Sequence, residues 1–164
     1  MACNNAENKS TDLKDTTQRD TTVVVATPIN FKDVKLQSIY GGYISLKNAL
    51  VASNAADANT AAGKLAGELK VYSGCENTAL IAQKIEKSDD LVLQRKEFTS
   101  LSNDVISLFK HAELTEGVIY LQHCPMANKG DGGDWLASEK KIQNPYYGSE
   151  MMECGAVLEE IKTK

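Results

Sequence analysis

Apolar side chains recur at steps of three and four residues through four stretches between residues 36 and 112, and this pattern limits the fold more than any other feature. Such spacing places the apolar groups on one face of an α-helix. The four predicted helices cover about residues 36–50, 58–72, 76–87 and 88–112. Amphipathic helices joined by short connections favour an antiparallel four-helix bundle, because each helix must bury its apolar face against a neighbour.

Turn and cap residues mark the ends of these helices. The pair Ser73-Gly74 is typical of a helix stop, and Ser88 is the predicted N-cap of the last helix. The acidic residues Asp89 and Asp90 then suit the positive end of its dipole. Gly41-Gly42 interrupts the first helix, at a cost of about 1 kcal/mol per glycine relative to alanine.

The character of the sequence changes after Gly117. Val118-Ile119-Tyr120-Leu121 is β-branched and aromatic, which indicates a strand. Turn residues follow at 130–133 and 144–145, and residues 155–164 fit either a strand or a short helix. The predicted fold class is therefore mainly α. A helical bundle covers residues 31–116, and a loop-rich segment with one or two short strands covers residues 117–164 and packs on the bundle as part of one domain.

Residues 1–30 are predicted to be a flexible tether, because most of them are polar and offer little apolar surface to bury. Cys3, near the start, resembles the first residue of a mature bacterial lipoprotein, which carries a lipid on that cysteine. The alternative is an incidental cysteine in a disordered tail. The lipoprotein interpretation predicts a periplasmic or cell-envelope location, with attachment to the outer membrane through Cys3.

Bulk properties exclude some classes of function. The net charge of -4 gives no basic surface for nucleic acid. No apolar run approaches the roughly 18 residues that a transmembrane helix needs. The four cysteines are irregularly spaced and lack the paired spacing of a structural zinc site.

Two sulfur-rich clusters near the C-terminus are the strongest functional candidates. In an extended segment, Cys124 and Met126 would present both sulfurs on one face. Met151 and Cys154 are three residues apart, which matches one face of a helical turn. Thiolate and thioether sulfurs select soft ions, so this set suits Cu(I) or Ag(I).

Each member of this set has an alternative role. Cys124 and Cys154 could form a disulfide, because exported proteins live under oxidising conditions. The methionines could fill the core, and only one of the adjacent Met151 and Met152 is expected to face a site. His123 is a possible additional ligand, although strand alternation predicts that it points away from Cys124.

The same alternation argues against an enzyme. Adjacent cysteine and histidine side chains on a strand cannot share a proton, and the sequence has no phosphate loop, nucleotide fingerprint or paired acidic motif. We therefore expect a binding protein without catalytic residues.

Several motifs resemble one known family. They are residues 123–127, a glycine-rich turn followed by Trp135-Leu136, residues 144–148, residues 151–155, and the helical residues 43–51. Together they are similar to an uncharacterised bacterial domain of unknown function. This domain occurs alone in exported proteins and at the C-terminal end of periplasmic adaptor subunits of Cus-type copper/silver efflux pumps. The resemblance extends over about residues 36–160.

The resemblance implies a periplasmic location and a heavy-metal efflux context. It puts Cys124, Met126, Met151 and Cys154 on matching motif positions. The leading hypothesis is a periplasmic or lipid-anchored protein that sequesters Cu(I) or Ag(I), or hands it to a partner such as an efflux adaptor. The alternative is a metal-free structural or interaction domain held by a Cys124–Cys154 disulfide.

Overall fold

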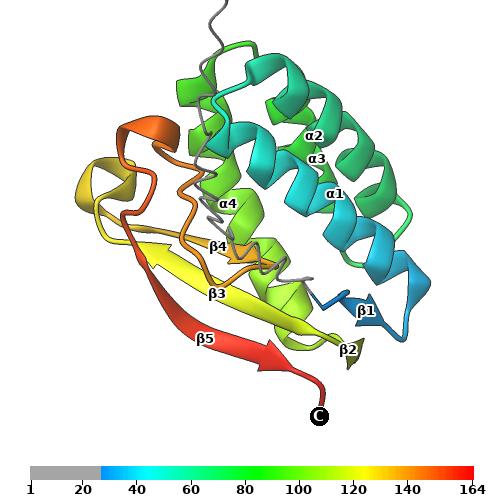
Figure 1. The fold of residues 1–164 in the computed structure, drawn as a ribbon. Coiled ribbons are helices and arrows are strands. Elements are labelled where there is room, and N and C mark those ends of the chain that lie inside the picture. The colour runs from blue at the N-terminus through cyan, green and yellow to red at the C-terminus, as the bar shows by residue number, and fades with distance from the viewer. Residues whose placement is uncertain (1–26) are drawn as a thin grey trace, which may run out of the picture.

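The structure, a computed structural model, describes residues 27–164 and contains four α-helices and five strands in that range (Figure 1). In chain order the elements are β1 (Asn30–Phe31), α1 (Val34–Val51), α2 (Ala55–Lys70), α3 (Glu76–Glu86), α4 (Leu91–Lys110), β2 (Leu114–Glu116), β3 (Val118–Cys124), β4 (Gly133–Ala137) and β5 (Ala156–Lys162). Two 3₁₀ turns, η1 (Ala127–Gly130) and η2 (Gly148–Glu150), lie within the C-terminal connections. The four predicted helices are confirmed.

The strands form two small antiparallel sheets. β1 pairs with β2, and a three-stranded sheet has the order β4-β3-β5. The described chain therefore has more strands than the one or two predicted. Residues 155–164, whose sequence fits either a strand or a helix, contain strand β5, which runs antiparallel to β3.

Side-chain caps set where α1, α2 and α4 begin. Asp33 caps α1 by accepting from the backbone N–H of Lys35, and Asn54 caps α2 by accepting from Asp57. The prediction that Ser88 caps the fourth helix is wrong: Asp90, with an extended backbone, accepts from the N–H of Val92. The Ser88 hydroxyl accepts instead from the N–H of Asp90, so it supports the capping residue.

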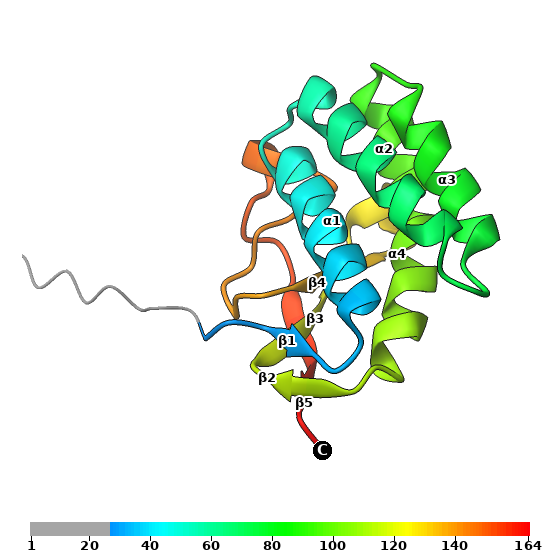
Figure 2. The same ribbon diagram turned by 90° about the vertical axis from the view of Figure 1, so that its right-hand side faces the viewer.

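Each helix packs against the next one in sequence, and α4 also packs against β4. Figure 2 shows the helices gathered on one side of the three-stranded sheet. Small side chains on α2 permit close helix contacts, since Ala58 and Ala62 are fully buried. Gly42 of α1 faces α2, because a Cβ atom there would lie 3.4 Å from the Cβ atom of Leu65 and 2.7 Å from the end of the flexible Glu68 side chain.

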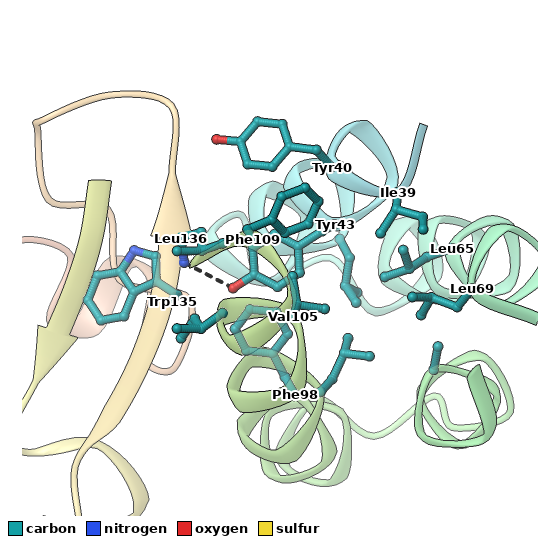
Figure 3. Close-up of a cluster of buried hydrophobic side chains, with 14 of the residues drawn as sticks. Ile39, Tyr40, Tyr43, Leu65, Leu69, Phe98, Val105, Phe109, Trp135 and Leu136 are labelled. Atoms are coloured by element: carbon teal, nitrogen blue, oxygen red, sulfur yellow. Dashed lines mark hydrogen bonds between the residues drawn. The ribbon is translucent and has the colours of Figure 1, made fainter. Parts of the chain in front are cut away.

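Aromatic side chains fill the junction between helices and sheet. Tyr43 of α1 stacks on Phe98 of α4 with ring centroids 5.6 Å apart, and Phe98 also contacts the ring of Tyr146. Figure 3 shows Tyr43 and Phe98 beside Leu136 of β4, with the tyrosine hydroxyl directed at the Leu136 backbone. This cluster places the C-terminal segment on the helices.

Two tyrosine hydroxyls satisfy backbone groups on the outer edge of β4. The Tyr43 hydroxyl accepts from the N–H of Leu136 at 3.1 Å, and the Tyr146 hydroxyl donates to the carbonyl of Asp134 at 2.9 Å. Burial raises the pKa of both tyrosines well above the ordinary value, so both remain protonated near neutral pH. The edge is therefore closed by side chains from outside the sheet.

Some predictions concern parts of the chain that the structure does not describe. Cys3 and most of the predicted tether over residues 1–30 lie outside the described residues. Within residues 27–164, none of the helices has the length and apolar character needed to cross a bilayer.

Candidate soft-metal site at Cys124 and Cys154

The last residue of β3 and the turn before β5 bring two cysteines into contact. The Sγ atoms of Cys124 and Cys154 lie 3.0 Å apart, although the residues are separated by 30 positions in the chain. Cys124 is fully buried, whereas Cys154 is partly exposed. The predicted convergence of the two thiols therefore occurs, with one thiol inside the protein and the other reachable from solvent.

Gly155 allows this close approach. Its φ of 144° is disfavoured for other residues, and a Cβ atom at this position would lie 2.6 Å from the carbonyl oxygen of His123. The same Cβ would also lie 3.1 Å from the ring of Trp135. The chain can thus run directly against the end of β3, and Cys154 comes to lie beside Cys124.

A glycine and an aromatic ring surround the Cys124 end of the pair. Cys124 lies opposite Gly133 in the β3–β4 register. The ring of Tyr146 covers Gly133, because a Cβ there would lie 2.6 Å from a ring carbon. Tyr146 also packs edge-on against Trp135, with centroids 6.1 Å apart. These contacts exclude water from the Cys124 side.

The groups around Cys154 shift the pKa of its thiol in opposite directions. Its hydrogen bond with Cys124 and its partial burial raise the pKa of the Cys154 thiol. The backbone of Met126 acts in the other direction and lowers this pKa. The Met126 backbone therefore favours the thiolate form of Cys154.

Met126 lies in a turn, so the prediction of an extended segment from Cys124 to Met126 is wrong. β3 ends at Cys124, and Pro125 and Met126 form a turn in which Met126 has φ −86° and ψ −12°. Proline suits a turn because its ring fixes φ near −65°. The Met126 side chain is 51% exposed, and its carbonyl accepts from the hydroxyl of Tyr147.

The second cluster also forms a turn rather than the helical turn that its spacing suggested. The N–H of Cys154 donates to the carbonyl of Met151 at 3.1 Å and closes residues 151–154. Met151 has φ −145° and ψ 52°, which are not helical angles. Met151 and Met152 are both partly buried.

His123 lies on the other face of β3. Its Nδ1 is 2.6 Å from a carboxylate oxygen of Asp134, its partner on β4. The imidazole and this carboxylate line an open cavity of about 470 Å³ between the sheet and α4, which Lys96 and Asn103 border from the helix. Strand alternation thus separates His123 from the sulfur pair, as the sequence predicted.

Two further residues that hold the site were not identified as such from the sequence. Arg95 of α4 donates from Nε to the carbonyl of Pro145 and from Nη2 to that of Leu50, which ties the C-terminal loop to α1. Asn144 is fully buried and donates from Nδ2 to the carbonyl of Cys154. A signal for Asn144 was present, since asparagine before proline often bonds the backbone two residues later.

The donor set suits a soft ion better than a hard one. Across residues 27–164, no three His, Cys, Asp or Glu side chains are grouped so that they could hold a metal ion. The convergent donors are instead the thiols of Cys124 and Cys154, and the exposed Met126 lies in the turn that follows Cys124. Thiolate and thioether ligands fit Cu(I) or Ag(I).

Comparison with known proteins gives one match. Residues 39–117 match the model of the family described as "Protein of unknown function (DUF3347)". No curated protein and no solved structure matches the chain. The matched residues run from α1 to the residue before β3, so the match ends before Cys124. The predicted resemblance to an uncharacterised domain is confirmed over this range, where residues 39–117 are similar to this family of unknown function.

Proposed function

We propose that this protein binds Cu(I) or Ag(I) through the thiolates of Cys124 and Cys154 and sequesters the ion or passes it to a partner. The observation that carries the proposal is the 3.0 Å separation of two sulfurs from distant segments of the chain. A bridging ion with metal–sulfur bonds of about 2.3 Å needs sulfurs roughly 3.5 to 4 Å apart. A small rotation of the partly exposed Cys154 side chain supplies this change.

Ligand exchange is the proposed mechanism. Cys124 anchors the ion in the protein interior, and Cys154 joins it from the turn at the surface. Met126, half exposed in the turn that follows Cys124, would supply a thioether that an incoming ligand can displace. Met151 or Met152 is the proposed fourth donor, and His123 is assigned no direct role because it faces the other side of β3.

The cellular setting of the proposal rests on the sequence. A lipidated Cys3 would tether the protein in the periplasm, on the outer membrane. The partner would be an envelope protein with a similar soft-metal site, such as a copper/silver efflux adaptor, and the metal is the cargo of a binding protein rather than part of an enzyme.

Competition for Cu(I) tests this function. The fully reduced full-length protein, kept without oxygen, is titrated against a Cu(I) chelator of moderate affinity. Cys124→Ser and Cys154→Ser should each weaken binding by more than about tenfold, since even the loss of a residue that only supports a ligand costs that much. Cys75→Ser is the matched control, because Cys75 is a buried cysteine at the start of α3, outside the pair. A wild-type protein that loses all Cu(I) to the chelator contradicts the proposal.

The same sulfur distance favours a second candidate. A disulfide needs an S–S distance of about 2.05 Å, which is roughly 1 Å shorter than the observed separation. In this case the protein is a structural or interaction domain locked by a Cys124–Cys154 bond. Peptide mapping without reduction distinguishes the two candidates, because purified protein with a quantitative 124–154 linkage and no bound metal supports the second.

A further inference from the structure

Asn144 has every polar group in use although it is completely buried. Its N–H donates to the carbonyl of Met152 at 2.9 Å, and its own carbonyl accepts from the N–H of Gly148 at 2.9 Å. Its side-chain oxygen accepts from the N–H of Tyr146 at 2.8 Å, and its side-chain nitrogen donates to the carbonyl of Cys154 at 3.0 Å. One residue thus joins four others of the same loop.

These four bonds connect the two ends of the loop that carries Cys154. The bonds from Tyr146 and Gly148 fold the first half of the loop around Asn144. The bonds to Met152 and Cys154 hold the second half at a fixed distance from the first. The first half is itself fixed to the helices, because Arg95 donates to the carbonyl of Pro145.

Cys154 depends on these bonds more than its partner does. Cys124 belongs to β3, which pairs with strands on both sides. Cys154 precedes β5 and lies in a turn that its own N–H closes on Met151. We infer that Asn144 is a positioning residue that fixes the backbone of Cys154 and thereby sets its thiol against Cys124.

As a statement about metal binding, this inference rests on the proposed function. As a statement about thiol geometry, it stands by itself. A side chain that orients a ligand typically changes metal affinity by about 10- to 100-fold when it is lost. The same orientation raises the effective concentration of one thiol at the other, which a disulfide equilibrium measures directly.

The test uses the full chain with Cys3→Ser and Cys75→Ser, so that only the pair can react. The reduced protein is equilibrated with mixtures of oxidised and reduced glutathione. Each closing event converts the Cys124 and Cys154 thiols to a disulfide, and their two hydrogens and two electrons reduce one oxidised glutathione to two glutathione thiols. Alkylation and mass measurement give the closed fraction at each ratio.

Asn144→Asp is the informative variant, because it keeps the oxygen that accepts from Tyr146 and loses the donor to Cys154. Gln122→Glu is its matched control. Gln122 is also a fully buried amide, and it donates to the carbonyls of Glu139, Lys140 and Lys141 in the preceding part of the same connection. Both variants therefore lose a buried donor and gain a buried carboxyl group. Asn144→Ser, which keeps a shorter oxygen acceptor, serves if the aspartate variant does not fold.

We expect the Asn144 variant to lower the equilibrium constant for closure at least tenfold relative to Gln122→Glu, a shift of about 30 mV. Cu(I) affinity in the chelator competition should fall by a similar factor. Equal closure constants for the two variants overturn the inference, as does a wild-type pair that stays open at every glutathione ratio. The two proposals can also fail separately. If Asn144→Asp lowers the closure constant as expected but the wild-type protein does not hold Cu(I), the inference is supported and the proposed function is rejected.

Discussion

The helical part of the molecule, residues 34–110, and the C-terminal segment, residues 114–162, are stabilised in different ways. The helices satisfy their own backbone groups and bury Ala, Leu and Ile side chains between them. The C-terminal segment consists of short strands and long connections, so it obtains hydrogen bonds from particular side chains such as the buried Tyr43 and Asn144 and the partly buried Arg95. Its shape therefore depends on single polar residues, whereas the helical part depends on a repeated pattern.

The family match follows the same division. The matched residues 39–117 cover the helices and β2, and the sulfur pair lies beyond them. The similarity to an uncharacterised family is thus confined to the helical part and β2, while the proposed metal chemistry rests on the geometry of the C-terminal segment alone.

The largest expected effect tests whether the two parts unfold together. Phe98 is fully buried at their junction and contacts both Tyr43 and Tyr146. Phe98→Ala should lower the free energy of unfolding by about 3 to 5 kcal/mol, because it leaves a cavity between α4 and the segment. Far-ultraviolet circular dichroism follows the helices, and fluorescence of Trp135, the only tryptophan, follows the C-terminal segment.

Both signals should report one shared transition at lower denaturant in the Phe98 variant. Leu80→Ala is the control, because Leu80 is 56% exposed on α3 and its loss should change stability by less than about 0.5 kcal/mol. Loss of the Trp135 signal well before the helical signal would show that the parts unfold separately, and would break the comparison.

The Tyr43 hydroxyl is expected to contribute measurably to the free energy that holds the C-terminal segment on the helices. Tyr43→Phe removes the oxygen that accepts from the Leu136 N–H and bonds the Ser102 hydroxyl. We expect a loss of about 1 to 3 kcal/mol in unfolding free energy, since buried polar groups are left unpaired. Tyr147→Phe is the control: its hydroxyl bond to Met126 is exposed, so its removal should cost less. Equal losses of unfolding free energy in the two variants would mean that burial of the hydroxyl does not determine its contribution to stability.

The smallest expected effect has the opposite sign and sharpens the contrast between the two regions. A Cβ atom added at Gly41, within α1, would meet nothing within 4 Å apart from its chain neighbours and the backbone of its own helix, so Gly41→Ala should stabilise the protein by about 0.5 to 1 kcal/mol. Gly155→Ala should destabilise it, because its φ of 144° and the nearby His123 carbonyl leave no room for a side chain. Thermal unfolding measures both, and destabilisation by Gly41→Ala would contradict this view of the helical part.

The helical part was predictable because its information is periodic. Residues such as Leu65 and Leu69 recur at helical spacing and are fully buried, as that spacing predicts. The N-cap of α4 was misplaced by two residues, because Ser88 and Asp90 are both good capping residues and only the backbone angles select between them.

The site was predictable in composition and less so in conformation. The meeting of Cys124 and Cys154 followed from the two sulfur-rich motifs, and the separation of His123 followed from strand alternation. The turn at Met126 did not, because the sequence alone does not show where β3 ends. The hydrogen bond from Asn144 to the Cys154 carbonyl could not be predicted either, since a bond across ten residues depends on the path of the whole loop.

The tyrosine hydroxyls on β4 have a consequence for how the protein meets other chains. A neighbouring strand cannot pair with the Leu136 N–H and the Asp134 carbonyl unless it displaces the rings of Tyr43 and Tyr146. Growth of the sheet is therefore confined to β5, where the charged side chains Glu159, Glu160 and Lys162 oppose stacking of like strands. The protein discourages fibre formation with phenol groups on one border of the sheet and with charge on the other.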